Sequence, residues 1–245
     1  MSSQIERAQL HSQALRNASA AEVAAWAVET FKGGLTIASS FGAEDVVLID
    51  LFYRADNNVR IFTLDTGRLH DETYEVMDKI RKHYPGLNLE VYFPNQIAVQ
   101  NLTRDKGFFS FRDSIDNRKE CCNIRKVEPL QRALNNADAW VTGLRREQSV
   151  TRGDLQKVEV GGPGHPDICK INPLLEWSEE DVWDYIRDFD VPYNALHDKD
   201  FPSIGCAPCT RAILSGEDVR AGRWWWESPD TRECGLHPTP RKKAS

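Results

Sequence analysis

Strand-like and helix-like segments alternate through the first half of the chain, and this alternation restricts the fold more than any other feature. Short strands are expected at 34–40 (GLTIASS), 59–66 and 87–94, separated by helical patterns at 45–55 and 69–84. The pattern predicts an α/β fold, in which a parallel, twisted sheet is flanked by helices. Ser19 and Glu22 form a capping-box pattern, which predicts a further helix over 22–31, before the first of these strands.

The second half is less regular. It is expected to contain a helix over 121–137, a strand over 139–146, a turn-rich stretch over 160–166 and a helix over 178–189 that Ser178 caps. Cys169 lies among apolar neighbours, which is typical of a structural strand residue. We expect residues 1–190 to form the α/β part, and residues 191–245 to form an irregular C-terminal extension of the same domain.

Composition excludes several classes of function. The chain has 245 residues, a formal net charge of −6 and a pI near 5.6, so it has no general attraction for nucleic acid or anionic membranes. No stretch approaches the roughly 20 apolar residues of a membrane span, and the N-terminus lacks an apolar signal core. These features predict a soluble, cytoplasmic protein. Oligomeric state is not fixed by the sequence, and a homo-oligomer stays open.

Three polar motifs follow predicted strands, at the sheet edge where α/β proteins bind ligands. They are SSFGAED (39–45), LDTGR (64–68) and GLRREQS (143–149). Their small residues and cations suit an anionic nucleotide, as do further arginines near the C-terminus. By itself each motif is equally consistent with an ordinary turn or solvated arginines. The candidate substrate-binding residues are Ser39, Ser40, Phe41, Gly42, Asp65, Thr66, Gly67, Arg68, Arg145, Arg146, Arg220 and Arg223.

Four of the six cysteines form two pairs that predict a metal site. Cys121 and Cys122 are adjacent, and Cys206 and Cys209 form a C-x-x-C motif. Four thiolates complete either a tetrahedral zinc site or an iron–sulfur cluster. Adjacent side chains on a helix diverge by about 100°, which a larger cluster tolerates more readily than zinc does. Both interpretations stay open at this point.

Cys234 stands apart from the other cysteines. Its neighbours in RECGLH (232–237) are charged or small, which favours a reactive thiol over a packed one. Arg232 and His237 are placed to lower its pKa. The alternative is an exposed thiol with no role.

The motifs in this order resemble the assimilatory adenylyl-sulfate (APS) reductases, the iron–sulfur branch of the phosphoadenylyl-sulfate (PAPS) reductase family. The resemblance covers about residues 39–237 and includes CCNIRKVEPL, IGCAPCTR, WWWE and ECGLH. It implies an adenine-nucleotide alpha-hydrolase-like fold of the PP-loop type. It also implies one [4Fe–4S] cluster per chain on Cys121, Cys122, Cys206 and Cys209.

The same resemblance implies a mechanism. Cys234 would attack the sulfur of APS, release AMP and carry an S-sulfonate, which thioredoxin or a glutaredoxin-like reductant would discharge as sulfite for cysteine synthesis. Lys126, matched to the lysine between cluster and substrate, and His237 complete the catalytic set.

Three alternatives remain at the level of sequence. A PAPS or dual-specificity reductase would tolerate a 3′-phosphate. A sulfur transferase that uses ATP would normally carry a Ser-Gly-Gly-x-Asp-Ser loop, which SSFGAED replaces here. A nucleotide-binding iron–sulfur sensor would need no nucleophile in ECGLH.

Overall fold

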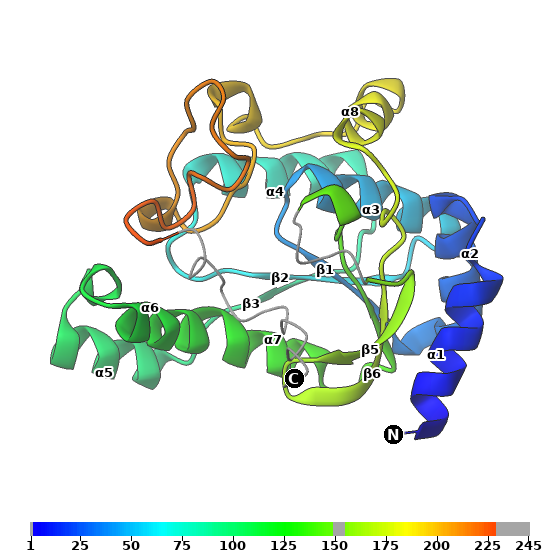
Figure 1. Cartoon of the computed structure of the whole chain (residues 1–245), viewed down its shortest axis with the longest axis horizontal. Helices are drawn as coiled ribbons and strands as arrows, with labels where there is room; N and C mark the ends of the chain where they lie inside the picture. Colours follow the sequence, from blue (N-terminus) through cyan, green and yellow to red (C-terminus); the bar gives the residue numbers. More distant parts are fainter. Residues whose placement is uncertain (1, 149–154, 229–245) are drawn as a thin grey trace, which may run out of the picture.

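A six-stranded sheet forms the centre of the protein. The computed structural model describes residues 2–148 and 155–228. The strand order is β3-β2-β1-β4-β6-β5, and every neighbouring pair is parallel except the antiparallel pair β5 and β6 (Figure 1). The prediction of a parallel sheet within an α/β fold is therefore confirmed. The strands are β1 (Leu35–Ser39), β2 (Arg60–Leu64), β3 (Leu89–Tyr92), β4 (Ala139–Val141), β5 (Val158–Gly162) and β6 (His165–Ile171).

Helices cover both faces of the sheet, with α3, α4 and α8 on one side and α6 and α7 on the other (Figure 1). The capping boxes predicted at Ser19 and Ser178 are confirmed at the starts of α2 and α8. The α-helices are α1 (Ser2–Ala14), α2 (Ala20–Phe31), α3 (Ala43–Ala55), α4 (Asp71–His83), α5 (Gln96–Lys106), α6 (Ile115–Cys122), α7 (Glu128–Leu134) and α8 (Glu179–Asp188).

The register of the parallel strands brings three predicted motifs to one edge. Ser39, the last residue of β1, pairs with Thr63 of β2, and Ile37 pairs with Val141 at the end of β4. The loops that follow β1, β2 and β4 therefore begin side by side. This is the edge at which α/β sheets bind their ligands.

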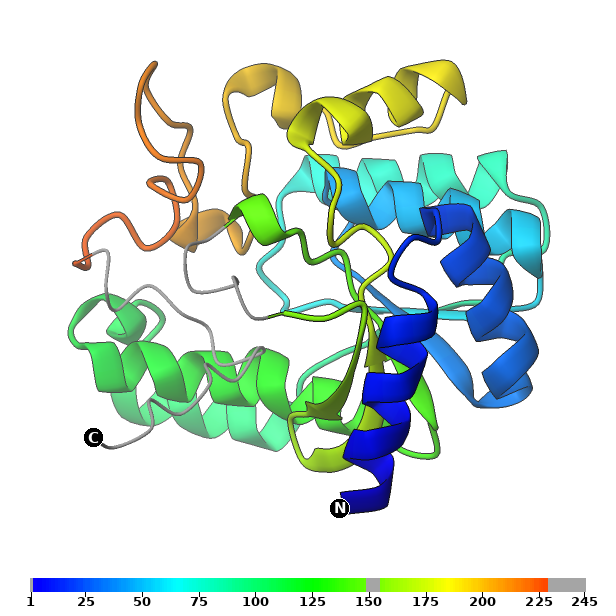
Figure 2. The ribbon, with the colours of Figure 1, turned by 45° about the vertical axis from the view of Figure 1, so that its right-hand side comes forward.

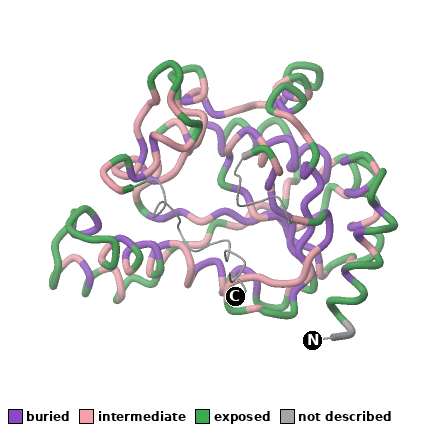
Figure 3. Tube along the Cα trace, in the orientation of Figure 1, coloured by how far each residue is buried: buried purple, intermediate pink, exposed green. Residues whose placement is uncertain are grey.

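The core lies between the sheet and the helices (Figure 3). All residues of α3 from Val46 to Phe52 are buried, including the charged Asp50. The Asp50 carboxylate accepts hydrogen bonds from the Arg54 guanidinium at 2.6 Å, the Tyr84 hydroxyl at 2.9 Å and the Tyr185 hydroxyl at 2.6 Å. Because Tyr84 follows α4 and Tyr185 lies in α8, this one carboxylate connects three helices.

The helix that carries the cysteine pair differs from the prediction. Helical structure begins at Ile115, not at Cys121, and continues through a π-helical turn, Asn123–Val127, into α7. Pro129 explains the wide turn, because proline cannot donate to the carbonyl four residues earlier and its ring clashes with that group. The cysteines thus lie within a long helix and directly before its irregular turn.

The predicted strand over 139–146 is shorter than expected, because it ends at Val141. The turn-rich stretch over 160–166 contains a turn at 163–164, and this turn joins the strands β5 and β6, which extend into the stretch from both sides. The α5 helix was not predicted. Short 3₁₀ turns complete the described structure: η1 (Lys32–Gly34), η2 (Ser110–Arg112), η4 (Arg146–Gln148), η6 (His197–Lys199) and η7 (Ala207–Cys209).

Between α8 and the last described residue, Ser228, the chain contains little regular structure. Figures 1 and 2 show this segment, coloured gold to orange-red, on the side of the molecule where α5 and α6 lie, away from α1 and α2. Its one isolated β-bridge in the described part joins Thr210 to Arg223. Throughout residues 2–148 and 155–228, no helix combines the length and apolarity that crossing a bilayer requires.

Candidate active site

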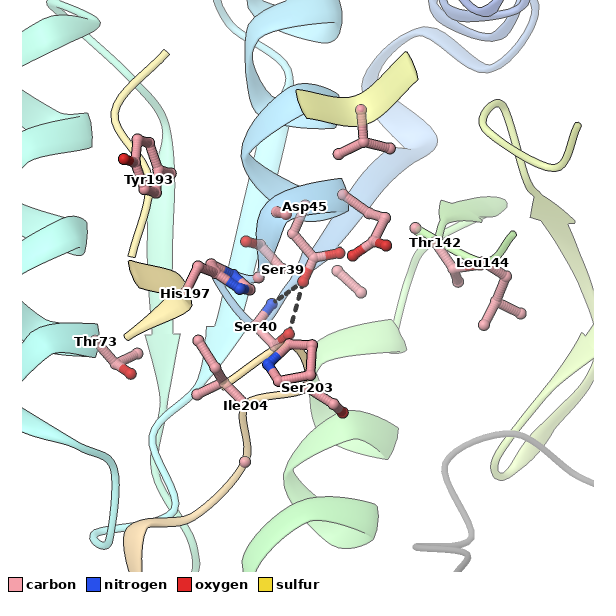
Figure 4. A pocket seen from close by; sticks show the side chains of 18 of the residues that line it. Ser39, Ser40, Asp45, Thr73, Thr142, Leu144, Tyr193, His197, Ser203 and Ile204 are labelled. Carbon is pink, nitrogen blue, oxygen red and sulfur yellow. Dashed lines mark hydrogen bonds between the residues drawn. The ribbon is translucent and has the colours of Figure 1, made fainter. Parts of the chain in front are cut away.

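A large cavity opens at the carboxyl ends of β1, β2 and β4. Its volume of about 750 Å³ is in the range of small-molecule sites. Residues from the predicted motifs line it together with residues from the segment after α8 (Figure 4). The predicted site residues on its wall are Ser39, Ser40, Gly42, Thr66, Lys126, Arg145, Arg220 and Arg223.

The loop between β1 and α3 donates hydrogen bonds to a carboxylate of the protein itself. Asp45, in the first turn of α3, accepts hydrogen bonds from the Ser40 backbone N–H at 2.5 Å and the Ser40 hydroxyl at 2.7 Å (Figure 4). Burial raises the pKa of Asp45 to about 6, against the lowering effect of these bonds. In this structure the Ser40 donors therefore already have a partner, although this motif was expected to bind an anionic nucleotide.

Arg145 is fixed by two carboxylates. Its guanidinium donates to Glu44 at 2.9 Å and to Glu147 at 3.0 Å, and its side chain is 6% exposed. The neighbouring Gly143 explains why the chain can pass so close to α3. A side chain there would come within 2.7 Å of Asp45 Oδ1 and 2.9 Å of Glu44 Cβ.

The loop after β2 divides its residues between two tasks. Thr66 lines the cavity, whereas Asp65 holds the loop together. The Asp65 carboxylate accepts from the Gly67 backbone N–H at 2.7 Å and from the Tyr74 hydroxyl at 3.0 Å. Gly67 has a φ of +71°, which favours glycine. Five of the predicted substrate-binding residues are described by the structure but do not line the cavity: Phe41, Asp65, Gly67, Arg68 and Arg146. Arg146 instead forms an ion pair with Glu176 at 2.7 Å.

The four predicted ligand cysteines meet in a second, much smaller cavity. Cys121 and Cys122 reach it from the end of α6, and Cys206 and Cys209 from the turn η7. Cys121 and Cys122 both reach this cavity, although adjacent side chains on a helix diverge by about 100°. The other residues that line this smaller cavity are Arg68, Phe111, Arg118, Arg125, Lys126, Arg223 and Trp224.

The surroundings of the four-cysteine cavity are strongly cationic. Arg68 Nη1 and Arg125 Nε are buried without a hydrogen-bond partner in the described structure. Burial raises the pKa of the Cys121 thiol, and the charges of Arg125 and Arg68 act against this rise. Burial also raises the pKa of the Cys209 thiol to about 12, and a metal group bound there would favour its thiolate form. The donor set and its cations therefore fit an anionic, thiolate-bound group.

Four cysteines line one cavity, which is the donor set of either a tetrahedral zinc site or an iron–sulfur cluster. Among the described residues, no three Cys, His, Asp or Glu side chains are already arranged to hold one metal ion.

Lys126 and Arg223 lie on the walls of both cavities and so separate the large one from the cysteines. Arg223 packs over the Trp224 ring at 4.8 Å and donates to the Ser203 hydroxyl and the Ile204 carbonyl, each at 3.2 Å. Gly205 leaves room for it, because a Cβ there would lie 2.6 Å from its guanidinium. The geometry places two cations between the large cavity and the four-cysteine cavity.

Some site residues were not predicted, and two predicted ones lie outside the described residues. Cys234 and His237 belong to the latter. Asp45 was part of a quoted motif but received no role. His197, Tyr193 and Trp183 line the cavity from the segment at and after α8, and no local pattern identifies them (Figure 4).

The family is decided by comparison of the whole sequence. The phosphoadenosine phosphosulfate reductase domain matches residues 34–212. The chain belongs to this family. Within the phosphoadenosine phosphosulfate reductase family it is 53% identical, over 83% of its length and 78% of the relative's, to an adenosine 5′-phosphosulfate reductase of Allochromatium vinosum. It is also 53% identical, over 82% of its length and 80% of the relative's, to the enzyme of the same name from Burkholderia cepacia.

Solved structures agree on the fold of this family. The PAPS reductase of Candida auris, in a phosphate complex, superposes with a TM-score of 0.72 at 29% identity, over 85% of this chain and 97% of that one. Yeast FAD synthetase superposes with a TM-score of 0.54 at 15% identity, over 79% and 66% of the two chains. The second likeness supports the adenine-nucleotide alpha-hydrolase-like fold alone.

Proposed function

We propose that this protein is an APS reductase, which converts APS to AMP and sulfite at the expense of reduced thioredoxin, in sulfate assimilation toward cysteine. The observation that carries the proposal is the shared wall, where Lys126 and Arg223 face both the nucleotide-sized cavity and the four cysteines. The relatives with the highest identities among those compared above are named adenosine 5′-phosphosulfate reductases.

Electrostatics is the main difficulty of this reaction, because a thiolate must approach an anionic phosphosulfate. Lys126, Arg220 and Arg223 line the cavity and supply cations that would bind the sulfate and phosphate oxygens. They would also stabilise the charge that develops on the leaving phosphate. Losing one well-placed donor of this kind typically costs about 10²–10³ in rate.

The first step forms a bond between the Cys234 sulfur and the sulfur of APS, and breaks the bond from that sulfur to the AMP phosphate oxygen. AMP leaves with the electron pair. We also assign His237, three residues after Cys234 in the sequence, to the catalytic residues of this proposal. A thioredoxin thiolate then attacks the Cys234 sulfur and expels sulfite with its electron pair. The second thioredoxin thiol closes the thioredoxin disulfide and regenerates Cys234, so the two electrons come from the dithiol.

The cofactor of this proposal is one [4Fe–4S] cluster held by Cys121, Cys122, Cys206 and Cys209. Bound there, it would supply a fixed negative group behind Lys126 and Arg223. The buried guanidinium atoms around the cysteines favour such a group, because they would otherwise lack a partner. The protein's own contribution is to hold these cations where the phosphosulfate is expected.

A single-turnover experiment tests the role of Cys234. Enzyme mixed with APS and no reductant should release one AMP per chain and leave one SO₃ group on the peptide that contains Cys234, as seen by mass spectrometry. Reduced thioredoxin should then release sulfite. A Cys234→Ser variant should retain iron and bind APS but release no AMP. AMP release that needs thioredoxin, without a protein adduct, would contradict the proposal.

Substrate preference is a separate test. We expect kcat/KM for APS to exceed that for PAPS by at least tenfold, about 1.4 kcal/mol of transition-state binding. Initial rates with both nucleotides and reduced thioredoxin measure this ratio. Equal values would support the alternative of a dual-specificity enzyme, and a preference for PAPS would support a PAPS reductase.

A further inference from the structure

A buried ion pair connects the cysteine helix to the last described part of the chain. Arg118 Nε and Nη2 each donate to the Glu227 carboxylate at 2.9 Å. The side chains are only 1% and 5% exposed, although the residues lie 109 positions apart in sequence. Arg118 also packs over the Trp224 ring at 4.9 Å and hydrogen-bonds the side chain of Cys122.

The same segment contacts the other cysteine pair. The Trp224 backbone N–H donates to the Cys209 carbonyl at 3.0 Å, and the Trp224 side chain is buried in the four-cysteine cavity. Trp226 packs against Phe111, near Cys121 and Cys209. Residues 224–227 therefore join α6 to η7, and Figures 1 and 2 both show the orange-red end of this segment near α6.

Cys234 follows this segment closely in sequence. Only five residues lie between it and Ser228, so the two residues are at most about 22 Å apart when the chain is fully extended. The position of residues 224–227 thus limits where the thiol can act. Arg223, which directly precedes these residues, lines the large cavity.

We propose that the Arg118–Glu227 ion pair is a positioning element: it fixes the base of the Cys234 segment to the cysteine helix and so sets the approach of the thiol to the substrate. This proposal rests on the proposed function. It also accounts for the ion pair itself, because removing two charges from water is costly and a buried ion pair is weak evidence for stability alone. A bidentate pair instead restricts geometry, and a misplacement of 1 Å can cost about 10² in rate.

The test compares Glu227→Gln with a matched control, Glu120→Gln. Glu120 also lies on α6 and forms an ion pair, with Lys106 at 2.6 Å, but its side chain is 41% exposed and does not contact residues 224–227. Three quantities are measured for each anaerobically purified protein: iron content, equilibrium binding of APS, and the single-turnover rate at which the SO₃ group appears on the Cys234 peptide.

We expect Glu227→Gln to form the adduct about 10- to 100-fold more slowly, with iron content and APS affinity within twofold of wild type. Glu120→Gln should match wild type in all three quantities. An unchanged adduct rate in Glu227→Gln would overturn the proposal. If Glu227→Gln loses iron, Arg118→Lys, which keeps the charge but not the bidentate geometry, replaces it. Slow adduct formation with full iron then supports the proposal, and parallel loss of iron and rate in both variants overturns it.

The wild-type protein separates this proposal from the proposed function. If wild type forms no adduct on Cys234, the proposed chemistry fails. If wild type forms the adduct and Glu227→Gln forms it equally fast, the chemistry stands and only the positioning role fails.

Discussion

Asp45→Asn should make the protein more stable at neutral pH and less sensitive to pH. The partly buried Asp45 carboxyl has a pKa of about 6, above its ordinary value of 3.8, so the folded protein holds this proton more tightly than the unfolded chain does. The stabilisation is therefore complete below pH 3.8 and is lost as pH rises through 6. Asparagine is neutral throughout and still accepts a hydrogen bond at the same place.

The magnitude follows from the two pKa values. Each pKa unit corresponds to about 1.4 kcal/mol, and only the upper part of the titration falls between pH 5 and 7.5. Wild type should lose between about 1 and 2 kcal/mol more unfolding free energy over that interval than the variant does. Asp45 lines the large cavity. A carboxylate that lowers the free energy of unfolding at neutral pH in this way is typical of a functional site.

Urea unfolding followed by circular dichroism at the two pH values measures this difference. Asp113→Asn, at an exposed position, is the control and should follow wild type. If wild type and Asp45→Asn show the same dependence on pH, the carboxylate is not strained by burial and the reasoning is wrong.

Two further predictions concern the cysteines and the core. Replacing Cys121 or Cys209 by Ser should remove about four irons and the acid-labile sulfide together with activity, whereas Cys169→Ser, in β6 and outside the four-cysteine cavity, should retain both. One zinc per chain without sulfide would contradict this. Asp50→Asn should lower the unfolding free energy by about 1–3 kcal/mol, because a neutral amide cannot replace a carboxylate that accepts from three side chains. Urea unfolding measures the loss, and an unchanged midpoint and slope would show that the network contributes nothing.

Features with a local cause were predictable from sequence. The strands at 35–39 and 60–64 and the helix between them follow from apolar periodicity, and the starts of α2 and α8 follow from side chains that cap their own helices. The β5 strand was missed because Val158–Gly162 ends in two glycines and lies at the sheet edge, where partners rather than propensity decide.

The candidate site was predictable only where function places unusual residues together in sequence. The cysteine pairs are of this kind, whereas Lys126 was implied only by the family resemblance. Arg118 was not predicted, because its partner Glu227 is 109 residues away and a single arginine within a helix carries no signal. The cavity residues His197 and Tyr193 likewise depend on how the segment after α8 folds over the sheet.

The π-helical turn Asn123–Val127 has a consequence for engineering this protein. A wide turn adds one residue to the helix, and each residue of an α-helix rotates the chain by about 100°. Deleting one residue from the turn would leave the two flanking helix faces close to their present orientation, because the wide turn already accommodates that residue. Making every residue of the turn α-helical, for example by replacing Pro129, would instead rotate Cys121 and Cys122 by about that angle relative to α7, away from the facing η7 pair. Sequence optimisation that rewards helix regularity would therefore select against the four-cysteine arrangement.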